Sequence, residues 1–185
     1  MGIVLGLEAA MYYSGIRKQK DLIKRLEEIN ISAEPIVINH IFHNTIKQLP
    51  VHMIYGICAV TNSSPGDWIK FVDKNGIEWV DKNPPLDKTA LQTSGIKFLL
   101  NRKGSVKQFT QGLDAHQIKI SSYTLRAAEL HTLKRLPLEF VHGVCIITGM
   151  SPGDWIRAVD SNGNEIKTKG IRLDGTIVRK PELND

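Results

Sequence analysis

The chain has 185 residues and a formal net charge of +5, from 24 lysines and arginines against 19 aspartates and glutamates. Hydrophobic residues make up 42% and charged residues 23%, a mixture that indicates a folded soluble protein and excludes a collagen-like or low-complexity chain. No stretch approaches the roughly 20 apolar residues that a membrane-spanning helix needs, so no membrane partner is expected. The length suits one large domain or two of about 90 residues.

An internal duplication is the strongest feature of the sequence. Residues 49–76 align without a gap on residues 136–163, at a constant offset of 87, and 15 of the 28 aligned positions are identical. Two copies are too few for a solenoid. The sequence therefore predicts two homologous units, residues 1–85 and 86–185, that pack as a pseudo-symmetric pair. The best linker is Asn83-Pro84-Pro85.

In the first unit, residues 6–13 are predicted to form a strand. Residues 17–29 are predicted to form a helix because their apolar positions recur at helical spacing. Residues 39–49 could be helix or strand, since residues 35–38 before them favour a strand. A three-stranded antiparallel meander is then expected, with strands at residues 51–61, 67–72 and 77–80.

Two turns define this meander. Pro65-Gly66 suits a type II turn, in which proline presets φ and glycine supplies a positive φ. Asn75-Gly76 lies between apolar runs and favours a type I′ hairpin.

The second unit repeats the pattern, with a strand at residues 96–101 and helices at residues 105–116 and 123–136. Its meander strands are residues 138–148, 154–159 and 164–167. The fold class predicted for the whole chain is a β-dominated α+β protein. Each unit would be a β-sandwich-like antiparallel meander with one or two short helices.

Side chains that could carry chemistry have simpler structural explanations. Cys58 and Cys145 occupy equivalent positions in apolar segments, where a free cysteine is usually a small buried hydrophobe. The six histidines show no zinc-ligand spacing, and no cofactor or metal is expected. The paired aspartates at positions 67, 154, 73 and 160 flank turns, where aspartate commonly caps backbone N–H groups. No catalytic motif is present, so an enzyme is not expected.

The positive charge is uneven. Residues 1–87 hold 9 basic and 10 acidic side chains, whereas residues 88–185 hold 15 and 9. A basic second unit could contact nucleic-acid phosphates or an acidic protein partner. The residues expected at an interface are two tryptophans and five basic residues near the C-terminus. They are Trp68, Trp155, Lys167, Lys169, Arg172, Arg179 and Lys180.

Two resemblances accompany these patterns. Residues 2–15 and the repeated SPGDWI segment with its VD-x-NG turn resemble strands of β-sandwich domains in small bacteriophage virion proteins, which decorate capsids or form fibres and tails. The Pro-Gly-Asp turn before residues 67–72 is also similar to that of swapped-hairpin DNA-binding barrels of the AbrB type. A duplicated copy would then form an intramolecular pseudo-dimer. Two observations argue against this second resemblance. A long strand is expected at residues 51–61, where such barrels have a short helix, and the charge is unevenly divided between the two units.

The first resemblance implies a non-catalytic structural protein of a virion, assembled in the host cytoplasm, that contacts other subunits and forms a homo-oligomer. The alternative is a nucleic-acid-binding protein of the swapped-hairpin type that uses the basic second unit.

Overall fold

The structure is a computed structural model that describes residues 2–78, 95–98, 106–160, 162–166 and 171. The first unit contains four elements before residue 48 and four after it. In order they are β1 (Gly2–Leu5), α1 (Leu7–Tyr13), α2 (Gln19–Glu28), α3 (Pro35–Phe42), β2 (Gln48–Pro50), α4 (Val51–Thr61), α5 (Pro65–Trp68) and β3 (Ile69–Val72).

The described elements of the second unit follow the same order, without a counterpart of α1. They are β4 (Gly95–Phe98), α6 (Val106–Ala115), α7 (Ser122–Glu129), β5 (Arg135–Pro137), α8 (Leu138–Thr148), α9 (Pro152–Trp155) and β6 (Ile156–Val159). Each element from α6 to β6 begins and ends 87 residues after its counterpart in the first unit. The duplication predicted from the sequence therefore extends to three-dimensional structure well beyond the aligned 28 residues. The predicted boundary at residues 83–85 lies outside the described residues.

The predicted β-dominated fold is wrong. Helices account for 53% of the structure and strands for 15%, and the described strands form small two-stranded sheets instead of a β-sandwich. The largest error concerns residues 51–61 and 138–148, which are the helices α4 and α8. The apolar run is compatible with either structure by periodicity alone, but its 11 residues exceed the usual strand length and favour a helix.

Apolar residues occupy most sides of α4 because neighbouring elements nearly enclose this helix. Met53, Ile54 and Ile57 are at most 1% exposed. A Cβ atom on Gly56 would lie only 2.7 Å from Cδ2 of Leu26 in α2, so the glycine allows α2 to pack closely. Such a helix lacks the amphipathic pattern that makes surface helices recognisable in a sequence.

Smaller corrections concern the ends of the units. Residues 7–13 form α1 where a strand was predicted, and β1 occupies only residues 2–5. The β-prone residues 35–38 begin helix α3, with Pro35 in its first turn, where a missing N–H costs nothing. The predicted helices at residues 17–29 and 105–116 are confirmed as α2 and α6, whereas α7 ends at Glu129, earlier than predicted.

The meander turns also differ from the prediction. Residues 65–68 form the short helix α5, and Gly66 does not have a positive φ. In the hairpin, Gly76 has φ +77° while Asn75 does not have a positive φ, so the turn is not of type I′. Strands β3 and β6 begin at Ile69 and Ile156, two residues later than predicted. Of the predicted third strands, the described residues show single bridges at Glu78 and Glu165, and residues 79, 80 and 167 lie outside the described part.

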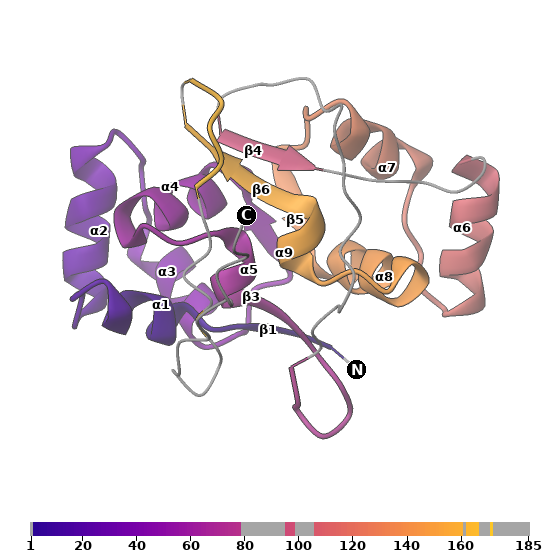
Figure 1. The fold of residues 1–185 in the computed structure, drawn as a ribbon, viewed down its shortest axis with the longest axis horizontal. Coiled ribbons are helices and arrows are strands. Elements are labelled where there is room, and N and C mark those ends of the chain that lie inside the picture. Colours follow the sequence, from indigo (N-terminus) through magenta and orange to yellow (C-terminus); the bar gives the residue numbers. More distant parts are fainter. Residues whose placement is uncertain (1, 79–94, 99–105, 161, 167–170, 172–185) are drawn as a thin grey trace, which may run out of the picture.

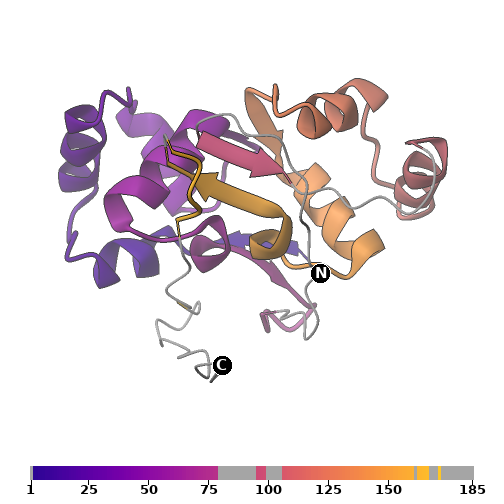
Figure 2. The same cartoon turned by 45° about the horizontal axis from the view of Figure 1, so that its top comes forward.

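The two units are interleaved and do not merely lie side by side. Strand β1 pairs with β3, β4 pairs with β6, and β2 pairs across the units with β5. Helix α8 of the second unit contacts β1 of the first, and α4 of the first unit contacts β4 and β6 of the second. Figures 1 and 2 show the resulting arrangement, with α2 at one end of the molecule, α6 at the other, and the strands and α5 and α9 between them. One continuous core follows from this exchange.

Candidate nucleic-acid interface

A pseudo-two-fold axis passes between β2 and β5. In this antiparallel pair Leu49 lies opposite Leu136, the residue at the equivalent position of the other unit. The flanking hydrogen bonds obey the same symmetry, since Val51 N–H donates to the Lys134 carbonyl at 2.9 Å and Leu138 N–H donates to the Lys47 carbonyl at 3.0 Å. The two-stranded ribbon is thus built from equal contributions of both units.

The ribbon is anchored on one side and exposed on the other. The Leu49 and Leu136 side chains are fully buried, and they fix the strands on the core. Lys47, Lys134 and Arg135 are exposed. The two segments that contain the ribbon, TIKQLPVH at residues 45–52 and TLKRLPLE at residues 132–139, include a single acidic residue, Glu139. The two segments around the pseudo-two-fold axis therefore carry three exposed basic side chains and one exposed acidic side chain, Glu139.

The axis also passes between the short helices α5 and α9. A Cβ atom built on Gly66 would lie 2.5 Å from the Cα of Gly153, and one built on Gly153 would lie 2.7 Å from the Cα of Gly66. Each helix begins with a capping box, in which a serine and an aspartate three residues later satisfy each other's backbone N–H groups. The SPGDW repeat thus supplies both the start of each helix and its contact with the other unit.

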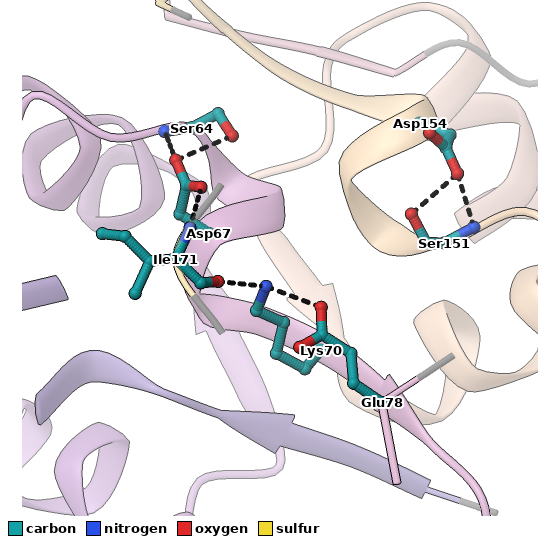
Figure 3. Close-up of polar contacts among 7 residues, drawn as sticks. All are labelled: Ser64, Asp67, Lys70, Glu78, Ser151, Asp154 and Ile171. Atoms are coloured by element: carbon teal, nitrogen blue, oxygen red, sulfur yellow. Dashed lines mark hydrogen bonds and ion pairs between the residues drawn. The ribbon is translucent and has the colours of Figure 1, made fainter. Parts of the chain in front are cut away.

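The aspartates of the two capping boxes lie in different surroundings, as Figure 3 shows. Asp67 is 1% exposed; its Oδ2 accepts from Ser64 N–H at 2.8 Å, and its Oδ1 accepts from Ile171 N–H at 3.1 Å. Lys70 donates from Nζ to the Ile171 carbonyl at 2.6 Å and to Glu78 Oε1 at 2.7 Å. Side chains of the first unit therefore form hydrogen bonds with both the N–H and the carbonyl of Ile171, a residue of the second unit.

The equivalent groups in the second unit are more open. Asp154 accepts from Ser151 N–H and Oγ at 2.8 and 2.7 Å. Arg157 replaces Lys70 and pairs with Glu165, and the two side chains are 25% and 43% exposed. The residue 87 positions before Ile171 is Pro84, which has no N–H to donate to a carboxylate. Pro84 therefore could not repeat the N–H contact that Ile171 makes with Asp67.

The tryptophans expected at an interface are fully buried in this chain. The indole N–H of Trp68 donates to Sγ of Cys58 at 3.4 Å, and the Trp155 ring packs edge-on against Phe140 with centroids 5.8 Å apart. Their structural environment is that of packing anchors between helix and strand. The five basic residues expected at the interface, Lys167, Lys169, Arg172, Arg179 and Lys180, lie outside the described residues.

The cysteines are free and buried. Burial raises the pKa of both Cys58 and Cys145 to about 12. A thiol with such a pKa is almost entirely protonated at neutral pH, and it is neither a nucleophile nor a metal ligand.

These thiols should affect the pH dependence of stability. An unfolded cysteine ionises near pH 9.0 and a folded one near pH 12, so unfolding releases protons in alkaline solution. We expect the free energy of unfolding to be unaffected by the thiols below about pH 8 and to fall as the pH rises from 9 towards 12. Chemical denaturation of wild-type protein and of Cys58→Ala/Cys145→Ala over this range measures the effect. An equal slope for the two proteins would contradict it.

Other titratable groups do not assemble into a reactive centre in the described part of the chain. Burial lowers the pKa of His142, whose ring lies 5.7 Å from that of Phe71. Hydrogen bonds from Asn164 lower the pKa of the exposed turn residue Asp160. Among the described residues, no group of three histidine, cysteine or acidic side chains could hold a metal ion, and no helix is long and apolar enough to cross a membrane.

Sequence reasoning did not single out the basic residues of the ribbon. Lys47 and Lys134 occupy equivalent positions in the weaker, upstream part of the repeat, and Arg135 follows directly. The lysine at this position in both repeats could be seen in the sequence. Its place beside a symmetry axis could not, because it depends on the pairing of β2 with β5. The comparisons add no relative: no protein-family model, curated protein or solved structure matches this chain significantly.

Proposed function

We propose that this protein binds double-stranded nucleic acid as a single-chain pseudo-dimer. The observation that carries the proposal is the β2–β5 ribbon, where Lys47, Lys134 and Arg135 are exposed around a pseudo-two-fold axis. A duplex backbone is itself two-fold symmetric, and proteins with matching symmetry place equivalent elements on both strands. Phosphate contacts from lysine and arginine supply most of the affinity in such complexes.

The pairing of the two units supports the same proposal. Strand β2 pairs with the equivalent strand of the other unit, which agrees with an intramolecular pseudo-dimer. The segment before the Pro-Gly-Asp turn is a helix in both units, as in swapped-hairpin DNA-binding barrels, but the described strands form two-stranded sheets and no barrel, so the proposal does not rest on that resemblance.

The uneven charge is a weaker objection than it was from sequence alone. The basic residues of the ribbon come from both units, one from the first and two from the second. A site on the symmetry axis needs only a local positive surface, since exposed charges more than about 10 Å apart are largely screened at 0.1 M salt.

Binding of a labelled duplex across a salt series tests the proposal. We expect the association constant to fall steeply with salt concentration, with a slope of about −0.9 for each phosphate contact on a log–log plot. The triple variant Lys47→Gln/Lys134→Gln/Arg135→Gln should bind more weakly at low salt, and its slope should be smaller by roughly 2 to 3. A labelled single strand measured in parallel shows whether the duplex is preferred.

A matched variant controls for the loss of three charges. Lys24, Lys74 and Lys107 are exposed and lie away from the ribbon, on α2, on the β3 hairpin and on α6. Replacing these three by glutamine removes the same charge and should leave most of the affinity and slope unchanged. Equal losses in the two triple variants would show that only net charge matters. Absence of duplex binding by the wild-type protein at low salt would refute the proposal and favour a protein partner for this surface.

A further inference from the structure

Each unit carries a pair of helices joined by a six-residue turn, residues 29–34 between α2 and α3 and residues 116–121 between α6 and α7. The two turns have the same backbone conformation although their residues differ. Asn30 and Gln117 both adopt a left-handed φ, of 59° and 60°, and the next residue donates its N–H to a leucine carbonyl of the preceding helix at 2.9 Å in both units. The inner faces are fixed by buried leucine, isoleucine and alanine side chains, for example Leu26 and Ile38 in the first pair.

The second helix of each pair leads directly to the ribbon. Five residues separate α3 from β2, and five separate α7 from β5. The paired helices therefore flank the pseudo-two-fold axis, one pair in each half of the molecule (Figures 1 and 2). Two helices joined by a turn, repeated about a two-fold axis, are an arrangement that can place one helix of each pair in the major groove on either side of a duplex centre.

The outer faces of α3 and α7 are unusual for a water-facing surface. Ile36 and the equivalent Tyr123 are 62% and 79% exposed, and both are among the most exposed large apolar side chains described. One helical turn further on, Asn39 and the equivalent Arg126 are also exposed. Arg126 forms a 3.7 Å ion pair with Glu129; the side chain of Arg126 is 66% exposed and that of Glu129 is 15% exposed.

This combination of side chains matches the chemistry of base edges. Asparagine can form two hydrogen bonds with N6 and N7 of adenine, and arginine can form two with O6 and N7 of guanine. Exposed apolar groups beside them can contact the methyl group of thymine.

We propose that α3 and α7 read the major groove on the two sides of the pseudo-two-fold axis and that Asn39 and Arg126 specify different bases. The preferred duplex would then be non-palindromic, with an adenine in one half-site where the other half-site has a guanine. This inference rests on the proposed function, because it requires that the chain binds a duplex.

Selection from a pool of randomised duplexes tests it. A random region of about 30 base pairs covers two half-sites one or two helical turns apart. Wild-type protein should enrich an asymmetric site. Asn39→Ala should weaken the adenine preference and Arg126→Ala the guanine preference, each by about 5- to 150-fold at one position only. Asn39→Arg should make the two half-sites alike, with guanine preferred in both.

Controls separate the possible failures. Gln111→Ala removes an exposed polar side chain from α6 and should leave the enriched site unchanged. Melting temperatures equal to that of the wild-type protein would show that the variants remain folded, as expected for exposed positions. If the wild-type protein binds duplexes but Asn39→Ala and Arg126→Ala enrich the same site as it does, the inference is wrong and the proposed function stands. If the wild-type protein binds no duplex, both are overturned.

Discussion

Valine at position 66 or 153 is expected to lower the free energy of unfolding by about 3 kcal/mol, at the upper end for an overpacked core. The reason is the contact between two backbones. A Cβ atom on either glycine would lie 2.5–2.7 Å from the Cα of the other, and neither helix can move without disturbing the capping boxes and the strands that follow. Urea denaturation of Gly66→Val and Gly153→Val measures the loss.

Alanine variants make the test more specific. Gly66→Ala and Gly153→Ala should each lower the free energy of unfolding. The loss in the double variant should differ from the sum of the two single losses, because both substitutions disturb the same contact. Gly2→Ala is the control, since a Cβ there would have no atom within 4 Å. Stability equal to wild type in Gly66→Ala would show that α5 and α9 do not touch as described.

Lys70→Met is expected to cost about 3 kcal/mol, whereas Arg157→Met at the equivalent position should cost less than about 1 kcal/mol. Lys70 is 5% exposed and satisfies both Glu78 and the Ile171 carbonyl. Without Lys70, the largely buried carboxylate of Glu78 and the buried carbonyl of Ile171 lose their hydrogen-bond donor. Removing one partner of a buried ion pair is strongly destabilising because the other charge stays buried and uncompensated. Arg157 and Glu165 are partly exposed, and water can replace each partner.

The comparison of two equivalent positions removes most effects of local sequence. Both residues lie at the second position of a four-residue strand that follows the SPGDW segment. The double variant Lys70→Met/Glu78→Gln should recover part of the stability, because no uncompensated charge then remains. Equal losses for Lys70→Met and Arg157→Met, measured by denaturation at one pH, would contradict the importance of the Ile171 contact.

The duplication was predictable because its strongest segment combines turn residues, caps and core residues that cannot vary freely. Asp67, for example, caps a helix through Ser64 and also binds Ile171. The helix α2 was predictable because one of its faces meets water and its apolar positions repeat at helical spacing. The helical spacing of α2 can be read within the segment itself, whereas the contact of Asp67 with Ile171 joins residues 104 apart in the chain and could not be read from it.

The fold class was not predictable by the same means, because α4 and α8 are buried on most sides. Their apolar residues carry no clear period, and β-branched residues such as Val51 and Ile54 favoured a strand. Tertiary packing overrides this preference, with Gly56 accommodating Leu26 at a helix–helix contact. A similar limit applies to Gly66: a positive φ was predicted there and is not found, and the glycine instead allows the close approach of Gly153.

The position of Lys47, Lys134 and Arg135 beside the symmetry axis also depends on long-range pairing. No local pattern indicates that residues 48–50 and 135–137, which are 87 residues apart, form one ribbon. The equivalence of Asn39 and Arg126 could be read from the offset, but their exposure could not.

The cross-unit pairing of β2 with β5 has a consequence for how such a chain can change over evolution. A homodimer encoded by one gene must carry the same residue at both symmetric positions, so every substitution occurs twice. Fusing the two copies removes this constraint while the pairing keeps them together. Lys70 with Arg157, Pro84 with Ile171, and Asn39 with Arg126 are positions where the halves have since acquired different residues. The fused chain can thus keep a symmetric framework while its two halves differ at individual positions.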